Sequence, residues 1–331
     1  MILSFFLILI FLNICLCWNY QYLADKLKIF DHPDNKLKID KKKTPLLGGF
    51  FIIFNLLILI TIDQSLYEIF PFEKKREIIS FIFLIFSFFF IGLYDDKYKI
   101  SFSIRIVLGI LFSLMALLIN QNLKIDELLF SFYEHPILLK NFSLIFTLFS
   151  ILAFIHATNM FDGINSQLIT YYLILNTFLF YISNYNLNFL LFYPLLVSLF
   201  ILNFNGKIFL GDGGSYSLGA MYSFFIIYEY TTFKNIVFAD AILILTLIPG
   251  LELLRLSVYR LSKGRNIFSG DLEHVHHLFL KRFNQIKTNF IVCFLILTPI
   301  ILLLFYKTYL YLILLMSILS YFLIIYFLKK K

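Results

Sequence analysis

Asp212 stands among glycines in the stretch NFNGKIFLGDGGSYSLG, residues 203–219, which separates two long apolar runs. Glycine permits positive φ angles and lets the backbone approach a ligand closely, and the first amides of a helix that begins here would favour an anion. In proteins, Mg²⁺ is usually held by one or two carboxylates together with phosphate oxygens. The stretch therefore predicts a Mg²⁺ ion bound by Asp212 beside a phosphate group.

Asp95 and Asp96 form an acidic pair at the end of an apolar run, in GLYDDKYK at 92–99. Charged residues at the end of a membrane helix could simply carry the helix into water. Adjacent carboxylates repel each other, however, so keeping both ionised favours a metal ion or a lysine beside them. The residues alone leave both interpretations open.

Asn159 and Asp162 stand three residues apart in HATNMFDGIN, residues 156–165. On a helix this spacing places both side chains on one face. Gly163, which follows directly, is typical of a helix end. An ordinary helix cap would explain the same pattern when it is taken alone.

His274, His276 and His277 lie close together in DLEHVHH, residues 271–277, beside a run of lysines and arginines. A structural zinc site needs four nitrogen or sulfur ligands, and neither a cysteine nor a second spaced pair of histidines accompanies them. Three imidazoles in a basic setting are better suited to phosphate oxygens or polar sugar groups. A solvated interfacial loop with incidental histidines is the alternative.

Membrane helices must position these residues. The chain has 331 residues, 60% of them hydrophobic, and a mean hydropathy of +0.87, which excludes a soluble globular protein. A spanning helix needs about 20 apolar residues. Such runs are centred near residues 10, 55, 86, 112, 149, 174, 197, 223, 245, 297 and 318. The sequence therefore predicts an all-α integral membrane protein, a bundle of about eleven transmembrane helices in one domain over residues 1–331.

Lysines and arginines predict the orientation of this bundle. They concentrate in the odd-numbered connections, which places the N-terminus outside and the C-terminus in the cytoplasm by the positive-inside rule. Basic residues at a cytoplasmic rim also explain the net charge of +8 without a nucleic-acid polymer as partner. The four polar segments described above, together with KKKTPLLGG at 41–49, all fall on the cytoplasmic side, so we expect one shared site there.

Taken in order, the segments KTPLLGG, GLYDD, ATNMFDGIN, NFNGKIFLGDGGSYSLG and GRNIFSGDLEHVHHL resemble the polyprenyl-phosphate N-acetylhexosamine-1-phosphate transferases, a superfamily that includes the MraY and WecA types. The resemblance covers residues 41–282. It implies an enzyme that transfers N-acetylhexosamine-1-phosphate from a UDP-N-acetylhexosamine to undecaprenyl phosphate and releases UMP, initiating a lipid-linked cell-envelope glycan. It further implies Mg²⁺ as cofactor, with Mn²⁺ as a substitute.

The same resemblance implies roles for matching residues. Asp212 and Asp162 would bind the metal ion, and Asp95, Asp96 and Asp162 would be catalytic, with the acidic pair near the lipid phosphate. The residues that would bind substrate are Lys43, Asn159, His274, His276 and His277. The active site would face the cytoplasm from a bacterial inner membrane, in contact with membrane lipid, and the resemblance allows a homodimer.

The His-x-His-His spacing and the eleven spans are closer to the WecA type than to the MraY type, which has ten spans and a run of three histidines. His156 stands where asparagine is commoner and Asn165 where aspartate is frequent, and both changes bear on the substrate more than on the reaction class. One alternative is an MraY-type phospho-N-acetylmuramoyl-pentapeptide transferase. Another, from a different class, is a multi-span secondary transporter, which would place its polar groups near the bilayer midplane.

Overall fold

The structure, a computed structural model, describes residues 2–31, 43–66, 70, 72, 74–184, 186–265 and 272–330. Each of the eleven predicted span centres lies within a helix. The α-helices are α1 (Ile2–Trp18), α2 (Tyr20–Leu27), α3 (Gly48–Leu66), α4 (Lys75–Tyr98), α5 (Phe102–Ile119), α6 (Ser143–Phe161), α7 (Gln167–Ile182), α8 (Tyr193–Phe204), α9 (Gly211–Thr231), α10 (Ala239–Leu245), α11 (Leu247–Ser262), α12 (Val275–Leu280), α13 (Gln285–Phe305) and α14 (Leu310–Lys329). Short 3₁₀ turns are η1 (Gln121–Leu123), η2 (Lys140–Phe142), η3 (Leu187–Phe192) and η4 (Lys307–Tyr309).

Six stretches of the described chain are long and apolar enough to cross a membrane, by length and composition. They are Lys75–Tyr98, Phe102–Ile119, Lys140–Phe161, Leu187–Phe204, Gln285–Phe305 and Lys307–Lys329. Two bent pairs, α1 with α2 at 62° and α10 with α11 at 76°, bring the number to eight if each pair is one span. The predicted all-α polytopic architecture is confirmed, while the count of eleven spans stays a prediction.

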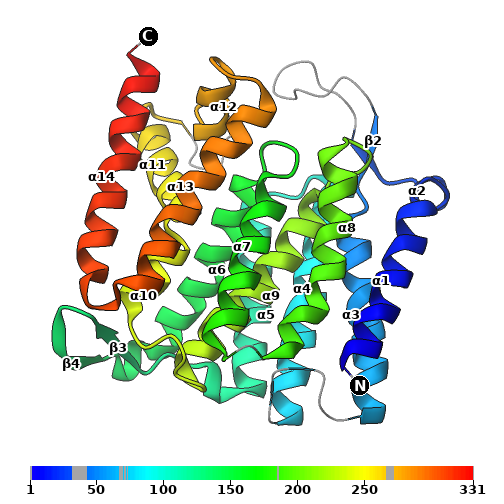
Figure 1. The fold of residues 1–331 in the computed structure, drawn as a ribbon, viewed down its shortest axis with the longest axis horizontal. Helices are drawn as coiled ribbons and strands as arrows, with labels where there is room; N and C mark the ends of the chain where they lie inside the picture. Colours follow the sequence, from blue (N-terminus) through cyan, green and yellow to red (C-terminus); the bar gives the residue numbers. More distant parts are fainter. Residues whose placement is uncertain are drawn as a thin grey trace.

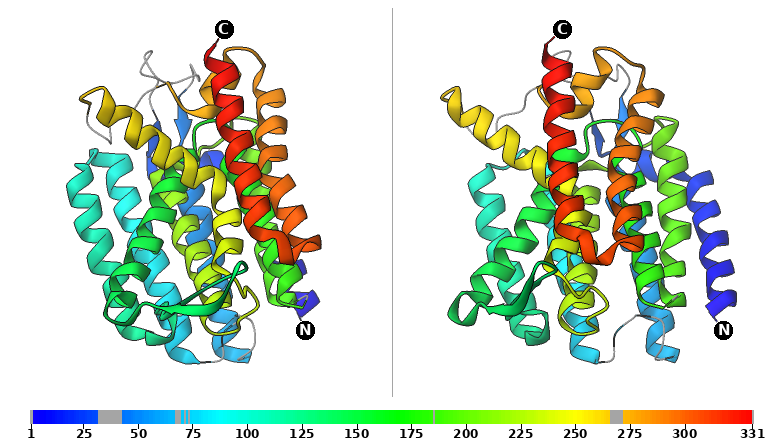
Figure 2. Two further views of the ribbon diagram at one scale, coloured as in Figure 1. Left: turned by 90° about the vertical axis from the view of Figure 1, so that its left-hand side faces the viewer. Right: turned by 60° about the vertical axis from the view of Figure 1, so that its left-hand side comes forward.

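The helices run between two ends of a bundle, with the N-terminus near one end and the C-terminus at the other (Figure 1). An odd number of crossings would produce this arrangement. Figure 2 shows α11, the yellow helix, tilted away from the bundle beyond its bend with α10.

Two short antiparallel sheets accompany the helices, one near each end of the bundle, and the sequence did not predict them (Figure 1). Near the end that carries the C-terminus, β1 (Phe30–Asp31) pairs with β2 (Thr44–Pro45). At the other end, β3 (Glu127–Phe130) pairs with β4 (Tyr133–Leu138).

Helix α9 forms the centre of the bundle and packs against α3, α4 and α6. Every residue from 213 to 230 is buried. Small residues in its first turns allow the neighbouring backbones to approach closely. A Cβ atom added to Gly92 of α4 would lie 2.3 Å from the carbonyl oxygen of Asp212, so these two helices touch backbone to backbone. This contact places the end of α4 beside the beginning of α9.

A cluster of polar side chains joins α1, α3 and α8 inside the apolar bundle. Asn13 and Asn55 are buried and exchange side-chain amide hydrogen bonds of 2.7 and 3.1 Å. The Ser198 hydroxyl donates to the Asn13 carbonyl oxygen at 3.0 Å. Each of these side chains also donates to a backbone carbonyl of its own segment, at 2.7 to 2.9 Å. The bonds between helices are therefore the ones that fix how α1 docks against the other two.

We expect Asn55→Leu to lower the free energy of unfolding by about 0.6 to 1.7 kcal/mol, because it leaves the Asn13 amide without its cross-helix partner. Denaturant titration of the protein in detergent micelles measures this change. Thr298→Val is the matched control, since that hydroxyl is exposed and bonds only to its own helix. An unfolding midpoint for Asn55→Leu equal to that of the control would contradict the expectation.

Candidate active site

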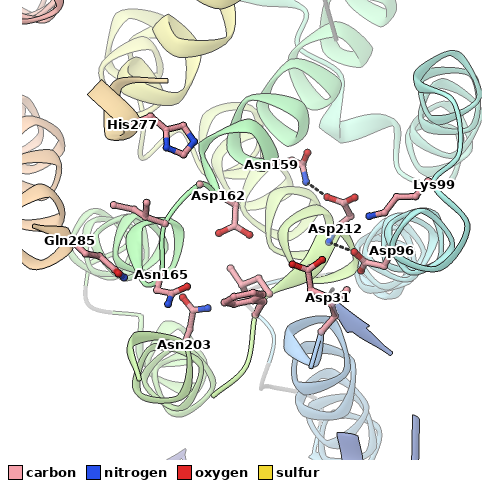
Figure 3. A pocket seen from close by; sticks show the side chains of 16 residues that line it. Asp31, Asp96, Lys99, Asn159, Asp162, Asn165, Asn203, Asp212, His277 and Gln285 are labelled. Carbon is pink, nitrogen blue, oxygen red and sulfur yellow. Dashed lines mark hydrogen bonds between the residues drawn. The ribbon is translucent and has the colours of Figure 1, made fainter. Parts of the chain in front are cut away.

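Chain segments far apart in sequence meet at a cavity of about 310 Å³. Each of the five polar segments singled out from the sequence contributes to its lining, through Leu46, Asp96, Asn159, Asp162, Asp212 and His277, among others. Figure 3 shows the side chains of Asp162 and Asp212 directed into this space. The lining lies where α4 and α6 end and α9 begins. The predicted convergence of the five segments is therefore observed.

Asp96 is held by the first turn of α9. Its Oδ1 accepts a hydrogen bond from the amide of Asp212 at 2.9 Å, and its Oδ2 accepts one from the amide of Gly213 at 3.0 Å. Gly211 has a φ of +69°, and a Cβ there would lie 2.7 Å from the Asp96 carboxylate. The anion at this helix N-terminus is thus a carboxylate of the protein itself, whereas the sequence predicted an external phosphate there.

Asp95 takes a different position from its neighbour. It is buried, and its Oδ2 accepts a hydrogen bond of 2.7 Å from Nη1 of Arg105 on α5. This guanidinium supplies the cation that the acidic pair was expected to need. Asp95 is not one of the described residues that line the cavity, so only Asp96 of the pair faces it.

Asn159 joins α6 to the start of α9. Its side-chain amide donates to Oδ1 of Asp212 and to the hydroxyl of Ser215, both at 2.7 Å. The Asp212 carboxylate also shares a side-chain hydrogen bond with Asp95. Asn159 therefore orients the Asp212 carboxylate within the cavity.

Asp162 reaches the cavity although it is not in a helix. Helix α6 ends at Phe161, one residue earlier than the spacing argument required, and Asp162 has a φ of −78° and a ψ of 66°. Burial, followed by repulsion from the carboxylates of Asp212 and Asp96, raises the pKa of Asp162 to about 7. Among the described residues its carboxylate has no hydrogen-bond partner. A cation nearby would favour its ionised form.

The donor set of the cavity is suited to a hard cation. Its acidic lining consists of oxygen ligands, the carboxylates of Asp31, Asp96, Asp162 and Asp212. In the described part of the chain, no group of three or more side chains from histidine, cysteine, aspartate or glutamate is arranged so that it could hold a metal ion. In proteins, Mg²⁺ is usually bound by one or two carboxylates and completes its shell with water and phosphate. The oxygen ligands of this lining fit a Mg²⁺ ion chemically, and its binding by Asp212 and Asp162 stays a prediction.

The three histidines occupy three different environments. His277 lines the cavity. His276 is buried, and its ring packs against Gly163: a Cβ atom added to Gly163 would lie 1.8 Å from Nε2 of His276. His274 lies with Nδ1 at 3.6 Å from a carboxylate oxygen of Glu252. Burial, followed by the positive charges of its neighbours, lowers the pKa of His276 well below its ordinary value. Of the three histidines only His277 lines the cavity, and the substrate contacts of His274 and His276 stay predictions.

The segment 41–49 supports the cavity from one side, and its Lys41 and Lys42 lie outside the described residues. The amide of Phe209 donates to the Pro45 carbonyl at 2.9 Å, and that of Gly48 donates to the Phe209 carbonyl at 3.2 Å. Lys43 lies over the ring of Phe30, with Nζ 4.2 Å from the ring centroid. Lys43 is not among the described residues that line the cavity, so its substrate contact stays a prediction.

Sequence reasoning missed several residues of the lining. These are Asp31, Lys99, Asn165, Asn203 and Gln285. Lys99 and Asn203 lie inside segments that were recognised as polar, and Asn165 was noted only as a departure from the family pattern. Asp31 and Gln285 had no local signal, because an isolated polar residue beside an apolar run is common. Their place depends on contacts between distant segments.

The comparison with known proteins agrees with the motif pattern. Residues 78–230 match the model of glycosyl transferase family 4. The undecaprenyl-phosphate alpha-N-acetylglucosaminyl 1-phosphate transferase of Escherichia coli O157:H7 is 29% identical over 205 residues, which cover 58% of this chain and 55% of that protein. The protein of the same name from Salmonella typhi is 27% identical over 203 residues, with the same two coverages of 58% and 55%.

A more distant relative covers more of the chain. The undecaprenyl-phosphate alpha-N-acetylglucosaminyl 1-phosphate transferase of Thermotoga maritima is 26% identical over 273 residues, 80% of this chain and 77% of that protein. The chain spans about half the length of the E. coli and Salmonella relatives, 55% in each case. The predicted resemblance to this transferase superfamily, and to its WecA type, is confirmed.

Proposed function

We propose that the protein transfers an N-acetylhexosamine-1-phosphate from a UDP-sugar to undecaprenyl phosphate and releases UMP. The observation that carries this proposal is the convergence of Asp96, Asn159, Asp162, Asp212 and His277 on one cavity beside an apolar bundle. The names of the relatives support the same reaction. The cavity lies at helix ends and not midway along the helices, which disfavours a secondary transporter.

The reaction exchanges one phosphoanhydride bond for another. An oxygen of the lipid phosphate attacks the β-phosphorus of the UDP-sugar, the bond from that phosphorus to the α–β bridging oxygen breaks, and UMP leaves with the bond's electrons. The lipid phosphate is already ionised near neutral pH, so the protein needs mainly to position the two substrates. Mg²⁺, when bound, would supply the positive charge that stabilises the leaving UMP.

Different residues of the cavity would take different roles in this reaction. Asp212, oriented by Asn159, and Asp162 would hold the metal ion, with Mn²⁺ as an alternative. Asp96 keeps the first turn of α9 in place through its two amide bonds, which makes its role positional. Lys99 and His277 line the same cavity and would contact phosphate oxygens. Asp95, which is buried against Arg105 and does not line the cavity, would act indirectly by holding the end of α4 against α5.

An apolar cavity is suited to the polyprenyl chain of the acceptor. It measures about 350 Å³ and is lined by residues of α6, α9, α10 and α11 together with β3. Ala157 of α6 lines this cavity, and Asn159, two residues later, lines the polar one. A lipid tail here would bring its phosphate toward the acidic residues from within the bilayer.

The proposed setting is a bacterial inner membrane with the polar cavity on the cytoplasmic side. The charge distribution of the sequence supports this orientation, with the N-terminus outside and eleven spans. A homodimer is compatible with it.

We expect the purified protein, given undecaprenyl phosphate, Mg²⁺ and one UDP-sugar of a panel, to release UMP. The panel includes UDP-GlcNAc, UDP-GalNAc and UDP-MurNAc-pentapeptide, and the UMP is measured by coupled enzymatic detection. Turnover with the pentapeptide substrate alone would favour the MraY-type alternative. Absence of UMP with every sugar, from folded protein, would reject the proposed reaction.

A further inference from the structure

Glu252 of α11 is the centre of a buried polar network. Its side chain is fully buried, and Nη2 of Arg255 donates to its Oε1 at 2.9 Å. The hydroxyl of Tyr321 donates to the same oxygen. The amide of Val275 donates to Oε2 at 3.0 Å. A carboxylate this deep in the protein is retained only where several donors satisfy it, as these do.

The network joins three helices that are distant in sequence. Val275 is the first residue of α12, so the Glu252 carboxylate caps the beginning of the helix that carries two of the three histidines. Tyr321 belongs to α14, and its hydroxyl also accepts a hydrogen bond of 2.9 Å from Nε of Arg255. Arg255 Nη2 donates further to the carbonyl of Glu273 at 2.7 Å. Backbone groups on both sides of His274 are therefore held by this network.

Helix α12 in turn touches the candidate active site directly. The buried ring of His276 packs against the backbone of Gly163, the residue after Asp162. His277 lines the cavity together with Asp162. A displacement of α12 would consequently move His277 within the cavity and change the environment of Asp162.

We propose that Glu252 is a positioning residue for the active site, acting through α12, with Tyr321 of α14 as part of the same anchor. The inference rests on the proposed transferase function and adds to it a contribution from the last helix of the chain, which lies outside the matched residues 78–230. Glu252 is not one of the described residues that line the cavity. It therefore contributes by holding α12 and not by touching substrate.

The expected effect is on turnover more than on affinity. Glu252→Gln keeps the shape of the side chain but removes the negative charge that pairs with Arg255. For comparison, residues that orient the ligands of a metal site typically contribute about 10- to 100-fold to metal affinity or activity. We expect kcat for UMP release to fall about tenfold, with KM for the UDP-sugar little changed.

A double-mutant cycle with His277→Ala separates positioning from general destabilisation. If Glu252 acts through α12, then Glu252→Gln costs little more once His277 is absent, because groups that act as a unit are non-additive. We expect the double variant to turn over like His277→Ala alone. Losses that multiply independently in the double variant would overturn the inference.

Two further variants complete the design. Glu229→Gln is the matched control, because Glu229 is equally buried, bonds to Asn235 at 2.7 Å, and lies at the other end of α9. It is expected to leave kcat unchanged. Tyr321→Phe keeps the carboxylate and its Arg255 partner, so it decides the question if Glu252→Gln does not fold. A Tyr321→Phe enzyme with wild-type kcat would then overturn the inference.

A distance measurement keeps this inference separate from the transferase proposal. Spin labels at Lys281, directly after α12, and at Asn205, directly after α8, are both on exposed positions. We expect one narrow distance distribution in the parent protein and in Glu229→Gln, and a broadened one in Glu252→Gln. If the distribution broadens as expected but no UMP is released, the transferase reaction is rejected and the positioning role of Glu252 is retained. An unchanged distribution would reject the positioning role whether or not the protein turns over.

Discussion

Asp212→Asn is expected to abolish most UMP release, a loss of about 10²- to 10³-fold, while the protein stays folded. Asparagine has nearly the same shape, and its side-chain oxygen can still accept the 2.7 Å hydrogen bond from Asn159. Only the negative charge is lost. Because Mg²⁺ is bound by few protein ligands in such sites, removing one carboxylate removes much of the protein's contribution.

Two measurements check this result. Released UMP reports turnover, and the electron paramagnetic resonance signal of free Mn²⁺ reports metal binding independently of turnover. Asp126→Asn is the matched control, since that carboxylate is exposed, pairs with Lys124 at 3.2 Å, and lies beyond the opposite end of α4. It should retain turnover within about twofold, as expected for an exposed ion pair. Near-normal turnover or Mn²⁺ binding in Asp212→Asn would reject the assigned metal role.

Gly92→Ala is expected to reduce UMP release at least tenfold and to lower the free energy of unfolding by about 1 to 3 kcal/mol. The added Cβ would lie 2.3 Å from the carbonyl oxygen of Asp212 and 2.5 Å from the amide nitrogen of Gly213. Backbone atoms at a helix start cannot move aside as a side chain can. Helix α4 must therefore shift, which withdraws the Asp96 carboxylate from the two amides that it holds.

Gly109→Ala is the control for this substitution. Its Cβ would lie 2.8 Å from Cδ2 of Leu152, the end of a flexible side chain, and the next atom is 3.5 Å away. We expect this variant to retain most of its turnover. Thermal unfolding in detergent and UMP release measured on both variants decide the matter. Equal behaviour of Gly92→Ala and Gly109→Ala would show that the α4–α9 contact does not control the site.

The sequence alone indicated the helices and the group of segments that meet at the cavity. Runs of apolar residues are long, local signals, and a membrane offers the backbone few structures other than helices. Clusters of acids, amides and glycines at the ends of these runs were also local. Gly211, with its positive φ beside Asp212, lies where the glycine-rich stretch predicted an unusual backbone.

Only the tertiary structure decided what each polar group does. Asp96 and Asp212 are 116 residues apart, and no local pattern showed that the Asp96 carboxylate, and not a substrate anion, would receive the amides at the start of α9. Arg105 was not recognised as the partner of Asp95. Glu252 and Tyr321, 69 residues apart, carried no sequence signal at all.

The physical reason for this division is the range of the interactions. Helix formation and membrane insertion depend on the composition of about 20 consecutive residues, so one sequence suffices to predict them. A hydrogen bond or an ion pair depends on atoms within about 3 to 4 Å, and which atoms come that close is set by how distant helices pack. The sequence therefore determined which residues could do the chemistry, and the packing of α4, α6, α9 and α12 determined which of them face the cavity.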